Sequence, residues 1–369
     1  MDYEPKEKTK NQLQKEISKA PRKEGIILDL SDLHYTLDIY EENEVYLLVS
    51  DLKKVYFDNP ENNLSLDDID YIVISGDFVE RGDSEASFEK AFHFIDILSK
   101  QLKVPYEKIV IVPGNHDLSW NITMNSYHLA IGTPGPNDKV VTNVGTDLFY
   151  LKRNDVEWYK KFTNYSKYLY EKLYKSPFPD NPKEQIKVIL GEFIENKKIA
   201  FFMLNTAAEI DQFNREITYF DTDGLIKASR QLPQNNIIKI AVGHHPVDLT
   251  NSYGNDIPFA NALQNENFKI YLHGHVHRTI SLDYLNPQNI NPNMLMIGAG
   301  ALSVGKSGLW PGVPERYNVI KISKTDTPNK ILVSVNTRQR EYIGTYWQPA
   351  YIYYEDDGKK LTNIWSNVI

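Results

Sequence analysis

The chain of 369 residues is acidic, with a formal net charge of −8, and it contains no cysteine. The lack of cysteine excludes disulfides, iron–sulfur clusters and thiolate zinc sites, and the acidic balance is unusual for a non-specific binder of duplex DNA. No apolar run approaches the roughly 18–20 residues that a membrane span needs, and the first residues lack the apolar core of a secretory signal. We therefore expect a cytoplasmic protein without membrane association.

Short apolar runs bounded by glycine, proline or aspartate recur after a mixed-charge lead-in, residues 1–24. Runs of this length are typical of buried β-strands. They cover residues 25–30, 71–75, 108–112, 199–204, 237–242, 269–272 and 294–298. Between the second and third runs, residues 83–102 carry apolar side chains at three- and four-residue steps, which predicts a helix. Strands alternating with helices indicate an α/β domain, which we assign to residues 25–305.

Residues 118–195 interrupt this alternation and predict an inserted subdomain, mainly helical. Within it, apolar side chains step by three or four from Trp158 to Leu173, as on one face of a helix. The opposite face carries lysines 160, 161, 167 and 172, which we expect to be solvated, with a binding patch as the alternative. After the insert and the last α/β strands, residues 306–369 hold two strands, 317–322 and 331–335, without a helix between them. They predict a β meander that closes the same domain.

Polar side chains follow five of the predicted strands directly. They are Asp32 and His34, then Asp77, then Asn115, His116 and Asp117, then His244 and His245, and finally His275 and His277. With His273, just before the last pair, seven of the nine histidines of the chain lie in these stretches. The carboxyl ends of strands form the ligand crevice in open α/β sheets, so we expect these side chains to converge. Carboxylate and amide oxygens mixed with imidazole suit Mn, Fe, Zn or Mg, and two ions about 3.5–4 Å apart can clamp a phosphoryl group.

In this order the five stretches resemble the pattern of the calcineurin-like metallophosphoesterases: D-x-H, G-D, G-N-H-[DE], a later histidine before a short apolar or proline stretch, and G-H-x-H. All five blocks are present between Asp32 and His277. The resemblance implies a four-layer α/β/β/α sandwich with the site on one rim. It also implies two divalent metal ions, Mn²⁺ first, with Fe²⁺, Zn²⁺ or Mg²⁺ as alternatives.

The resemblance also implies a role for each matching residue. The first metal would be held by Asp32, His34, Asp77 and His277, and the second by Asp77, Asn115, His244 and His275, so that Asp77 bridges the two. His116 would stand outside the metals as a general acid or as a contact to the substrate phosphate. Asp117 would orient His116, or cap a following helix. The pattern leaves no place among the ligands for His245 or His273, which we expect to support or pack.

The stretch GDFVERG, residues 76–82, resembles the G-D-x-V-D-R-G of the Ser/Thr protein phosphatases, in which the arginine helps to clamp phosphate. Arg81 is therefore a candidate for that role, with a surface or salt-bridging arginine as the alternative. Two departures count against that branch, because Pro113 precedes the G-N-H-D block and His277 completes G-H-x-H. A complete G-H-x-H is shared with the cyclic-nucleotide phosphodiesterases and with the SbcD-type nucleases.

Three main hypotheses, and one further alternative within the family, follow from the branch comparison. The first is a dinuclear phosphodiesterase that uses metal-activated hydroxide on a small nucleotide or related phosphodiester. The second is a nuclease on single-stranded or structured nucleic acid, with the tyrosine-rich, locally basic insert as a stacking platform. A phosphomonoesterase or protein phosphatase is a further alternative within the family. The third is a binding module without catalysis, which the complete set of expected ligands disfavours.

Overall fold

The computed structural model describes residues 24–37, 41–57, 68–144, 147–215, 218–233, 235–247, 250–252, 258–276, 288–291, 294–302, 313–327, 330–341, 345–354 and 361–369. The expected lead-in, apart from Glu24, and the expected ligand His277 lie outside the described residues. Among the described residues, no helix has both the length and the apolar character to cross a membrane.

The first main sheet has the strand order β17-β16-β15-β1-β2-β3, with β20 paired to β16. Its strands are β1 (Glu24–Leu30), β2 (Ile69–Ile74), β3 (Ile109–Ile111), β15 (Glu315–Lys324), β16 (Ile331–Arg340), β17 (Gln348–Pro349) and β20 (Ile364–Val368). The first three run parallel, whereas β15 and β16 pair antiparallel with β1 and with each other. The strands expected at the end of the chain therefore extend the sheet that begins it.

The second main sheet has the order β13-β14-β12-β10-β8-β7. Its strands are β7 (Lys187–Ile194), β8 (Lys197–Met203), β10 (Ile237–Val242), β12 (Ile270–His273), β13 (Gln288–Asn291) and β14 (Met294–Gly298). The four strands β8, β10, β12 and β14 are parallel, so their carboxyl ends share one edge. Two small pairs complete the β structure: β9 (Thr218–Phe220) with β11 (Thr250–Ser252), and β18 (Tyr353–Tyr354) with β19 (Leu361–Thr362).

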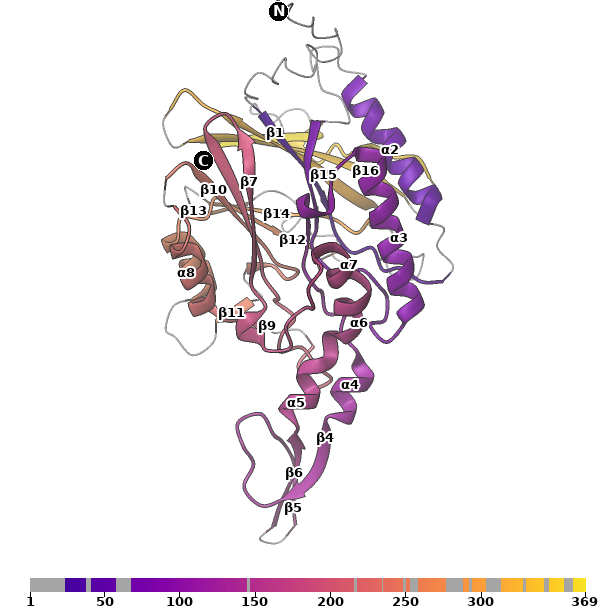
Figure 1. Cartoon of the computed structure of the whole chain (residues 1–369), viewed down its shortest axis with the longest axis vertical. Helices are drawn as coiled ribbons and strands as arrows, with labels where there is room; N and C mark the ends of the chain where they lie inside the picture. Colours follow the sequence, from indigo (N-terminus) through magenta and orange to yellow (C-terminus); the bar gives the residue numbers. More distant parts are fainter. Residues whose placement is uncertain are drawn as a thin grey trace, which may run out of the picture.

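Alternation along β8 shows how the layers pack, since successive side chains of a strand face opposite ways. Ile199 and Phe201 join the core shared with the first sheet, where the Phe201 ring lies 4.8 Å from that of Tyr71 on β2. Phe202 instead joins a separate core with Phe259. The helices α8 (Thr222–Arg230) and α9 (Phe259–Asn265) supply that second core. Figure 1 shows α2 (Glu41–Phe57) and α3 (Glu85–Leu102) beside the first sheet and α8 beside the second, so the predicted α/β class is confirmed.

The helix expected over residues 83–102 is α3, and its start follows from local chemistry. Ser84 is the N-cap, and its hydroxyl accepts a hydrogen bond from the Ser87 amide at 3.3 Å. Lys103 closes the helix in a left-handed conformation, φ 54°. The short 3₁₀ turn η2 (Tyr106–Lys108) then leads into β3. The loop of residues 76–84 therefore ends at the capping serine of this helix.

The interval 118–195 is not purely helical. It contains α4 (Trp120–Asn125), β4 (Tyr127–Ile131), β5 (Lys139–Val144), β6 (Asp147–Arg153), α5 (Asp155–Trp158), η3 (Tyr159–Phe162), α6 (Thr163–Tyr165), η4 (Ser166–Tyr170), α7 (Glu171–Tyr174) and η5 (Pro182–Glu184). The strands form an antiparallel sheet, β4-β6-β5, that projects from the main body (Figure 1). Strand β7 also falls in the interval but belongs to the second main sheet.

Lys161 departs from the expectation of a solvated lysine face. It is only 1% exposed, and its Nζ donates to the carbonyl oxygens of Ala208 at 2.5 Å and Ile210 at 2.9 Å. The ammonium also lies 3.3 Å from the ring centroid of Trp158. The reason is the 3₁₀ turn η3, in which residues three apart eclipse, so that Lys161 aligns with Trp158 on the buried side. Burial holds the pKa of Lys161 well below its usual value.

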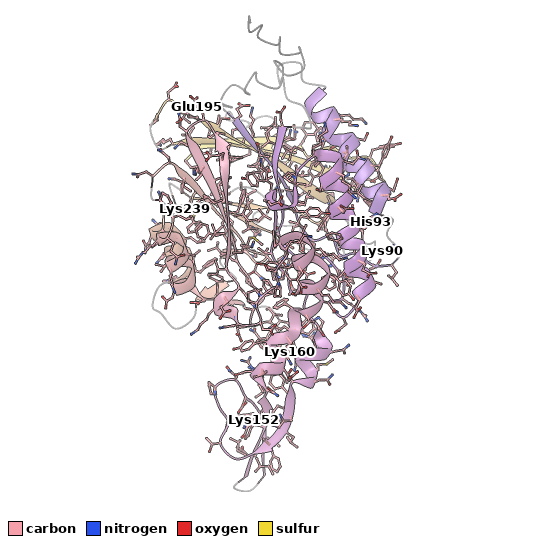
Figure 2. All side chains as sticks on the ribbon, in the orientation of Figure 1. Lys90, His93, Lys152, Lys160, Glu195 and Lys239 are labelled. Atoms are coloured by element: carbon pink, nitrogen blue, oxygen red, sulfur yellow. The ribbon has the colours of Figure 1, made fainter. Side chains whose placement is uncertain are left out.

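Lys161→Met should destabilise the protein by about 2–4 kcal/mol, because it leaves two buried carbonyls without their donor. The neighbouring Lys160→Met is the matched control. Figure 2 shows Lys160 on the insert. Its ammonium pairs with Glu157 at 2.8 Å on the surface, so its replacement should cost less than about 0.5 kcal/mol. Urea denaturation of both variants measures the difference. Equal midpoints would mean that the Lys161 contacts contribute nothing.

Asp29 is a buried carboxyl of β1, and its Oδ2 accepts a hydrogen bond from Asn318 at 3.1 Å. Burial raises its pKa from 3.8 to about 8, against the lowering effect of Asn318. The folded chain therefore binds this proton more tightly than the unfolded chain, and the free energy of unfolding falls as the pH rises through that window. Asp29→Asn should raise the melting temperature near about pH 9 more than near about pH 5. A pH-independent change in thermal unfolding would contradict the buried, protonated carboxyl.

Candidate metal centre

The predicted site residues come together where the carboxyl ends of strands from both main sheets meet. Asp32 and His34 follow β1, Asp77 follows β2, Asn115 and His116 follow β3, His244 follows β10, and His275 follows β12. The two sheets are joined directly at this rim. His244 Nδ1 lies 2.7 Å from the carbonyl oxygen of Ser75, and the His275 amide donates to Asp32 Oδ2 at 3.0 Å.

The loops that carry these residues adopt unusual backbone conformations. Asp32, His34, Asp77 and His275 all have positive φ, of 51°, 44°, 53° and 73°. The left-handed region costs a residue with a side chain roughly 1–2 kcal/mol, and such residues cluster at functional sites. Amide hydrogen bonds from Asp32 to Gly76 and from His34 to Asp77, both 3.0 Å, hold the two loops in register.

The Asp77 carboxylate lies between histidines from the two sheets. Its Oδ2 is 3.2 Å from His244 Nε2 and 3.6 Å from His34 Nε2, while its Oδ1 accepts from the His116 amide at 2.8 Å. Burial raises the pKa of Asp77, but the charges of His244, His116 and His34 outweigh it and hold the pKa well below 3.8. One ionised carboxylate thus faces two imidazoles, one from each main sheet.

The carboxylates also govern the two imidazoles. Burial lowers the pKa of His34, yet Asp32, Glu80 and Asp77 raise it overall to about 10. His244 behaves alike, since burial lowers its pKa while Asp77 and Asp32 raise it to about 9. This buried cluster therefore favours positive charge at its centre.

Asn115 completes a second group of donors. Its Oδ1 lies 3.0 Å from His244 Nε2 and 3.1 Å from His275 Nδ1. The donor atoms of Asp32, Asp77 and His244 all lie within 4.8 Å of one another. Buried oxygen and imidazole donors at such spacing fit a divalent cation.

Gly114 permits the close approach of the two loops. A Cβ at this position would lie 2.1 Å from Asp77 Oδ1 and 2.5 Å from the Asp77 amide nitrogen. Any larger residue would therefore displace the carboxylate at the middle of the site.

A family model described as calcineurin-like phosphoesterase matches residues 27–279. The chain belongs to the calcineurin-like phosphoesterase family. A relative from Bacillus subtilis (strain 168), described as the uncharacterized metallophosphoesterase-like protein YydB, is 22% identical over 342 residues. That alignment covers 90% of this chain but 61% of the relative, so the chain spans less than two thirds of the length of the relative.

Two solved structures show weaker likenesses to this calcineurin-like phosphoesterase. A dimetal phosphatase from Danio rerio has 10% identity and a TM-score of 0.39, covering 89% of this chain and 98% of the other. A Vps29 double mutant from Entamoeba histolytica has 9% identity and a TM-score of 0.29, covering 93% and 98%. Scores this low add nothing to the family assignment.

Asp117 does not contact the His116 ring of this phosphoesterase, so the expected orienting contact is corrected. Its carboxylate accepts hydrogen bonds from three backbone amides: Phe78 at 2.8 Å, Val79 at 3.2 Å and Gly114 at 2.8 Å. It is not a helix cap either, since Ser119 caps α4. Asp117 instead ties the loop after β2 to the loop after β3.

Glu80 takes the role that was expected of Asp117. Its carbonyl oxygen lies 2.9 Å from His116 Nδ1, and its carboxylate lies 3.1 Å from His34 Nδ1. The hydrogen bond to His34, with burial acting against it, lowers the pKa of Glu80. A single residue therefore orients one expected metal ligand and the candidate acid. Its place in the GDFVERG stretch was the only sequence signal for it.

Thr206 is a second residue that sequence reasoning missed. Its Oγ1 accepts from the amides of His244 and His245, both at 3.1 Å, and lies 2.9 Å from His245 Nδ1. His245 is itself buried, and Thr206 lies against its ring. No local pattern marks Thr206, because its partners lie almost forty residues along the chain.

Two expectations stay open in the structure. Arg81 is exposed on the loop after Asp77, and its guanidinium makes no hydrogen bond or ion pair to any described residue. Arg81 is thus a surface arginine without a salt bridge to the described residues. Its contact to the substrate phosphate stays a prediction. His273 is buried, with Nδ1 2.9 Å from the carbonyl oxygen of Gly274.

Proposed function

We propose that this calcineurin-like phosphoesterase hydrolyses phosphodiesters at a dinuclear metal centre. The observation that carries the proposal is the Asp77 carboxylate, set between His34 and His244. The first ion would be held by Asp32, His34, Asp77 and His277, and the second by Asp77, Asn115, His244 and His275. Mn²⁺ is the first choice, with Fe²⁺, Zn²⁺ or Mg²⁺ as alternatives for this mixed donor set.

Bound ions would polarise the phosphate and supply hydroxide at neutral pH. The residues of the chain do the remaining work. Because Nδ1 of His116 faces the Glu80 carbonyl, the ring is held with Nε2 as its other proton site. From there it can protonate the leaving oxygen as a general acid. Arg81, exposed on the loop of residues 76–84, would contact the non-bridging phosphate oxygens.

A small nucleotide or related diester is the substrate class that we favour over nucleic acid. The structure weakens the basic patch that a nuclease would use, because Lys161 is buried and Lys160 pairs with Glu157. Lys167 likewise lies 2.8 Å from the hydroxyl of Tyr168. Figure 2 shows Lys152 and Lys160 at different heights along the projecting insert, so these two lysines do not lie side by side. The domain limits expected from the sequence stay a proposal. The cytoplasmic location also stays a prediction.

Hydrolysis of a bis-aryl phosphodiester and of the matching aryl monoester, each with added Mn²⁺, tests the proposal. We expect a higher kcat/KM for the diester than for the monoester, which carries the same aryl leaving group. A strong preference for the monoester, or release of phosphate from phosphoserine peptides, would revive the protein-phosphatase interpretation of residues 76–82. Turnover of single-stranded DNA above that of either aryl ester would favour the nuclease.

A further inference from the structure

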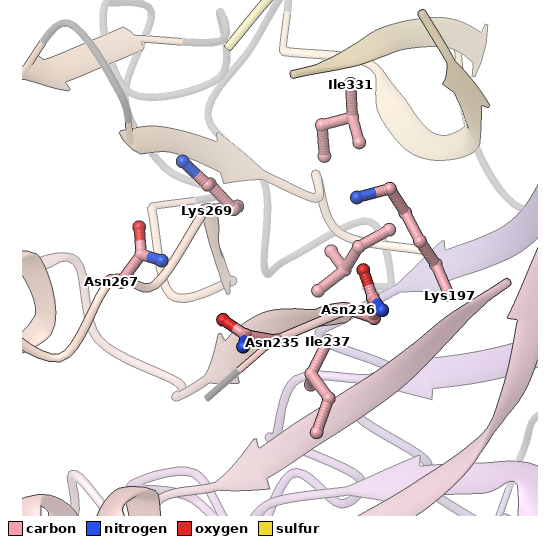
Figure 3. A pocket seen from close by; sticks show the side chains of 8 residues that line it. Lys197, Asn235, Asn236, Ile237, Asn267, Lys269 and Ile331 are labelled. Atoms are coloured by element: carbon pink, nitrogen blue, oxygen red, sulfur yellow. The ribbon is translucent and has the colours of Figure 1, made fainter. Parts of the chain in front are cut away.

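A small hollow lies at the edge of the second main sheet opposite the metal centre. Its volume is about 210 Å³, and it is lined by Lys197, Asn235, Asn236, Ile237, Ile238, Asn267, Lys269 and Ile331. Figure 3 shows the two lysine side chains and the asparagine amides around this hollow. Most of these residues stand at or just before the start of β8, β10 and β12, and Ile331 comes from the first sheet.

The length of the strands separates the hollow from the candidate metal centre. Strand β10 runs from Ile237, in the hollow, to Val242, and His244 lies two residues further on. At about 3.3 Å per residue, this path spans roughly 20 Å. The hollow is therefore separate from the candidate metal centre, and a ligand bound in it would not contact the metal-centre residues.

Positive charge gathers in the hollow without a balancing carboxylate. Within the described chain, the ammonium groups of Lys197 and Lys269 form no hydrogen bond or ion pair, and none of the residues that line the hollow is acidic. By contrast, the neighbouring Lys198 pairs with Glu192 at 3.3 Å. Burial, followed by the charges of Lys197 and Lys330, lowers the pKa of Lys269.

The hollow continues into a second one of about 290 Å³, which shares Lys197 and Asn236 and adds Lys324 and Lys330. Two acidic residues, Glu195 and Asp326, line this second hollow. Figure 2 shows Glu195 at the end of the molecule away from Lys152. The second hollow thus has two carboxylates for three lysines, whereas the first has two lysines and no carboxylate.

We propose that the first hollow binds a small phosphate-class anion through Lys197 and Lys269, with the amides of Asn236 and Asn267 as further donors. Lysine is a common phosphate ligand, and asparagine can donate to an oxyanion without adding charge. The volume is below the roughly 300 Å³ at which sites for larger organic ligands begin, which favours a small ion. Ile238 and Ile331, both buried, form an apolar floor.

Lysine acylation with and without orthophosphate tests the site directly. The intact protein is treated with a limiting amount of an acetylating ester, at constant ionic strength set with sodium chloride, and each lysine is quantified by peptide mass spectrometry. At a phosphate concentration about ten times Kd, acetylation of Lys197 and Lys269 should fall by about tenfold, since only the unbound fraction reacts. Lys198, next in the chain and paired with Glu192, should be unaffected and serves as the internal control.

A variant separates binding from general screening. Lys269→Gln should weaken phosphate protection of Lys197 by about tenfold, as expected for one lost charge-assisted hydrogen bond. Lys198→Gln should leave it unchanged, and both variants should keep the diester hydrolysis of the parent protein. Equal protection of all three lysines, no protection at all, or full protection of Lys197 in Lys269→Gln would each overturn the proposal.

Discussion

Asp77→Asn should abolish tight binding of both metal ions while the protein stays folded. The substitution removes one negative charge at the point where the two ligand sets meet, yet an amide oxygen can still accept the hydrogen bond from the His116 amide. Asparagine also tolerates the positive φ of 53° better than most residues. Asp77→Ala should lose the metals too, and it additionally removes the acceptor for His116.

Metal content per chain by mass spectrometry, together with far-ultraviolet circular dichroism, measures this result. Asp117→Asn is the comparison variant, because that buried carboxylate contacts only backbone amides and not the imidazoles. It should lower stability without changing the metal stoichiometry. Two metals per chain in purified Asp77→Asn and Asp77→Ala would show that the ligand assignment is wrong.

His116→Ala should keep both metals and lose most of the activity on an alkyl or nucleotide diester. Protonation of a departing alkoxide by a positioned acid contributes roughly 10²–10⁴-fold, so a loss of that order is expected. An aryloxide leaves readily without a proton, and the loss on an activated aryl diester should be distinctly smaller. The contact of the ring with the Glu80 carbonyl supports this role, because that carbonyl occupies Nδ1 and leaves Nε2 for the substrate.

The ratio of the two losses decides between the roles open to His116. Rates for an alkyl and an aryl diester, measured on the same metal-loaded preparation, give that ratio. Equal losses would indicate a contact to the phosphate instead of proton donation. Loss of metal in His116→Ala would make His116 a ligand. Glu80→Gln serves as a second variant, because it changes the side chain that contacts His34 and leaves the backbone carbonyl that contacts His116 in place.

The strands and the convergence of polar side chains could be predicted from the sequence because both depend on local patterns. The run 237–242 predicted β10 at its observed bounds, since buried parallel strands read as continuous apolar segments. The helix expected over 83–102 was found as α3 because its apolar spacing and its Ser84 cap agree. Polar residues directly after such strands must lie at a common edge, so the convergence of Asp77 and His244 could be expected.

Features that depend on contacts between distant parts of the chain could not be predicted from the sequence. Thr206 reaches His244 across 38 positions, and nothing in the residues around it announces that contact. The burial of Lys161 could not be predicted, because the helix tightens into a 3₁₀ turn at residues 159–162. This change turns Lys161 away from the exposed side on which the other lysines lie. The strands of the β4-β6-β5 sheet were missed because exposed apolar residues, such as Leu129 and Val140, obscure the alternation of a half-buried strand.

The pairing of Asp77 with His244, and of Asp32 with His275, joins segments that are far apart in the chain and belong to different sheets. A partly folded chain with only the first sheet in place would hold four of the seven expected donors and no complete cation site. Loading would therefore come late in folding, after the slow long-range contacts have formed. Bound ions would hold residues of both sheets together at this rim. Removal of the metal should therefore first weaken the contacts between the two sheets, and not the strand pairing within either sheet.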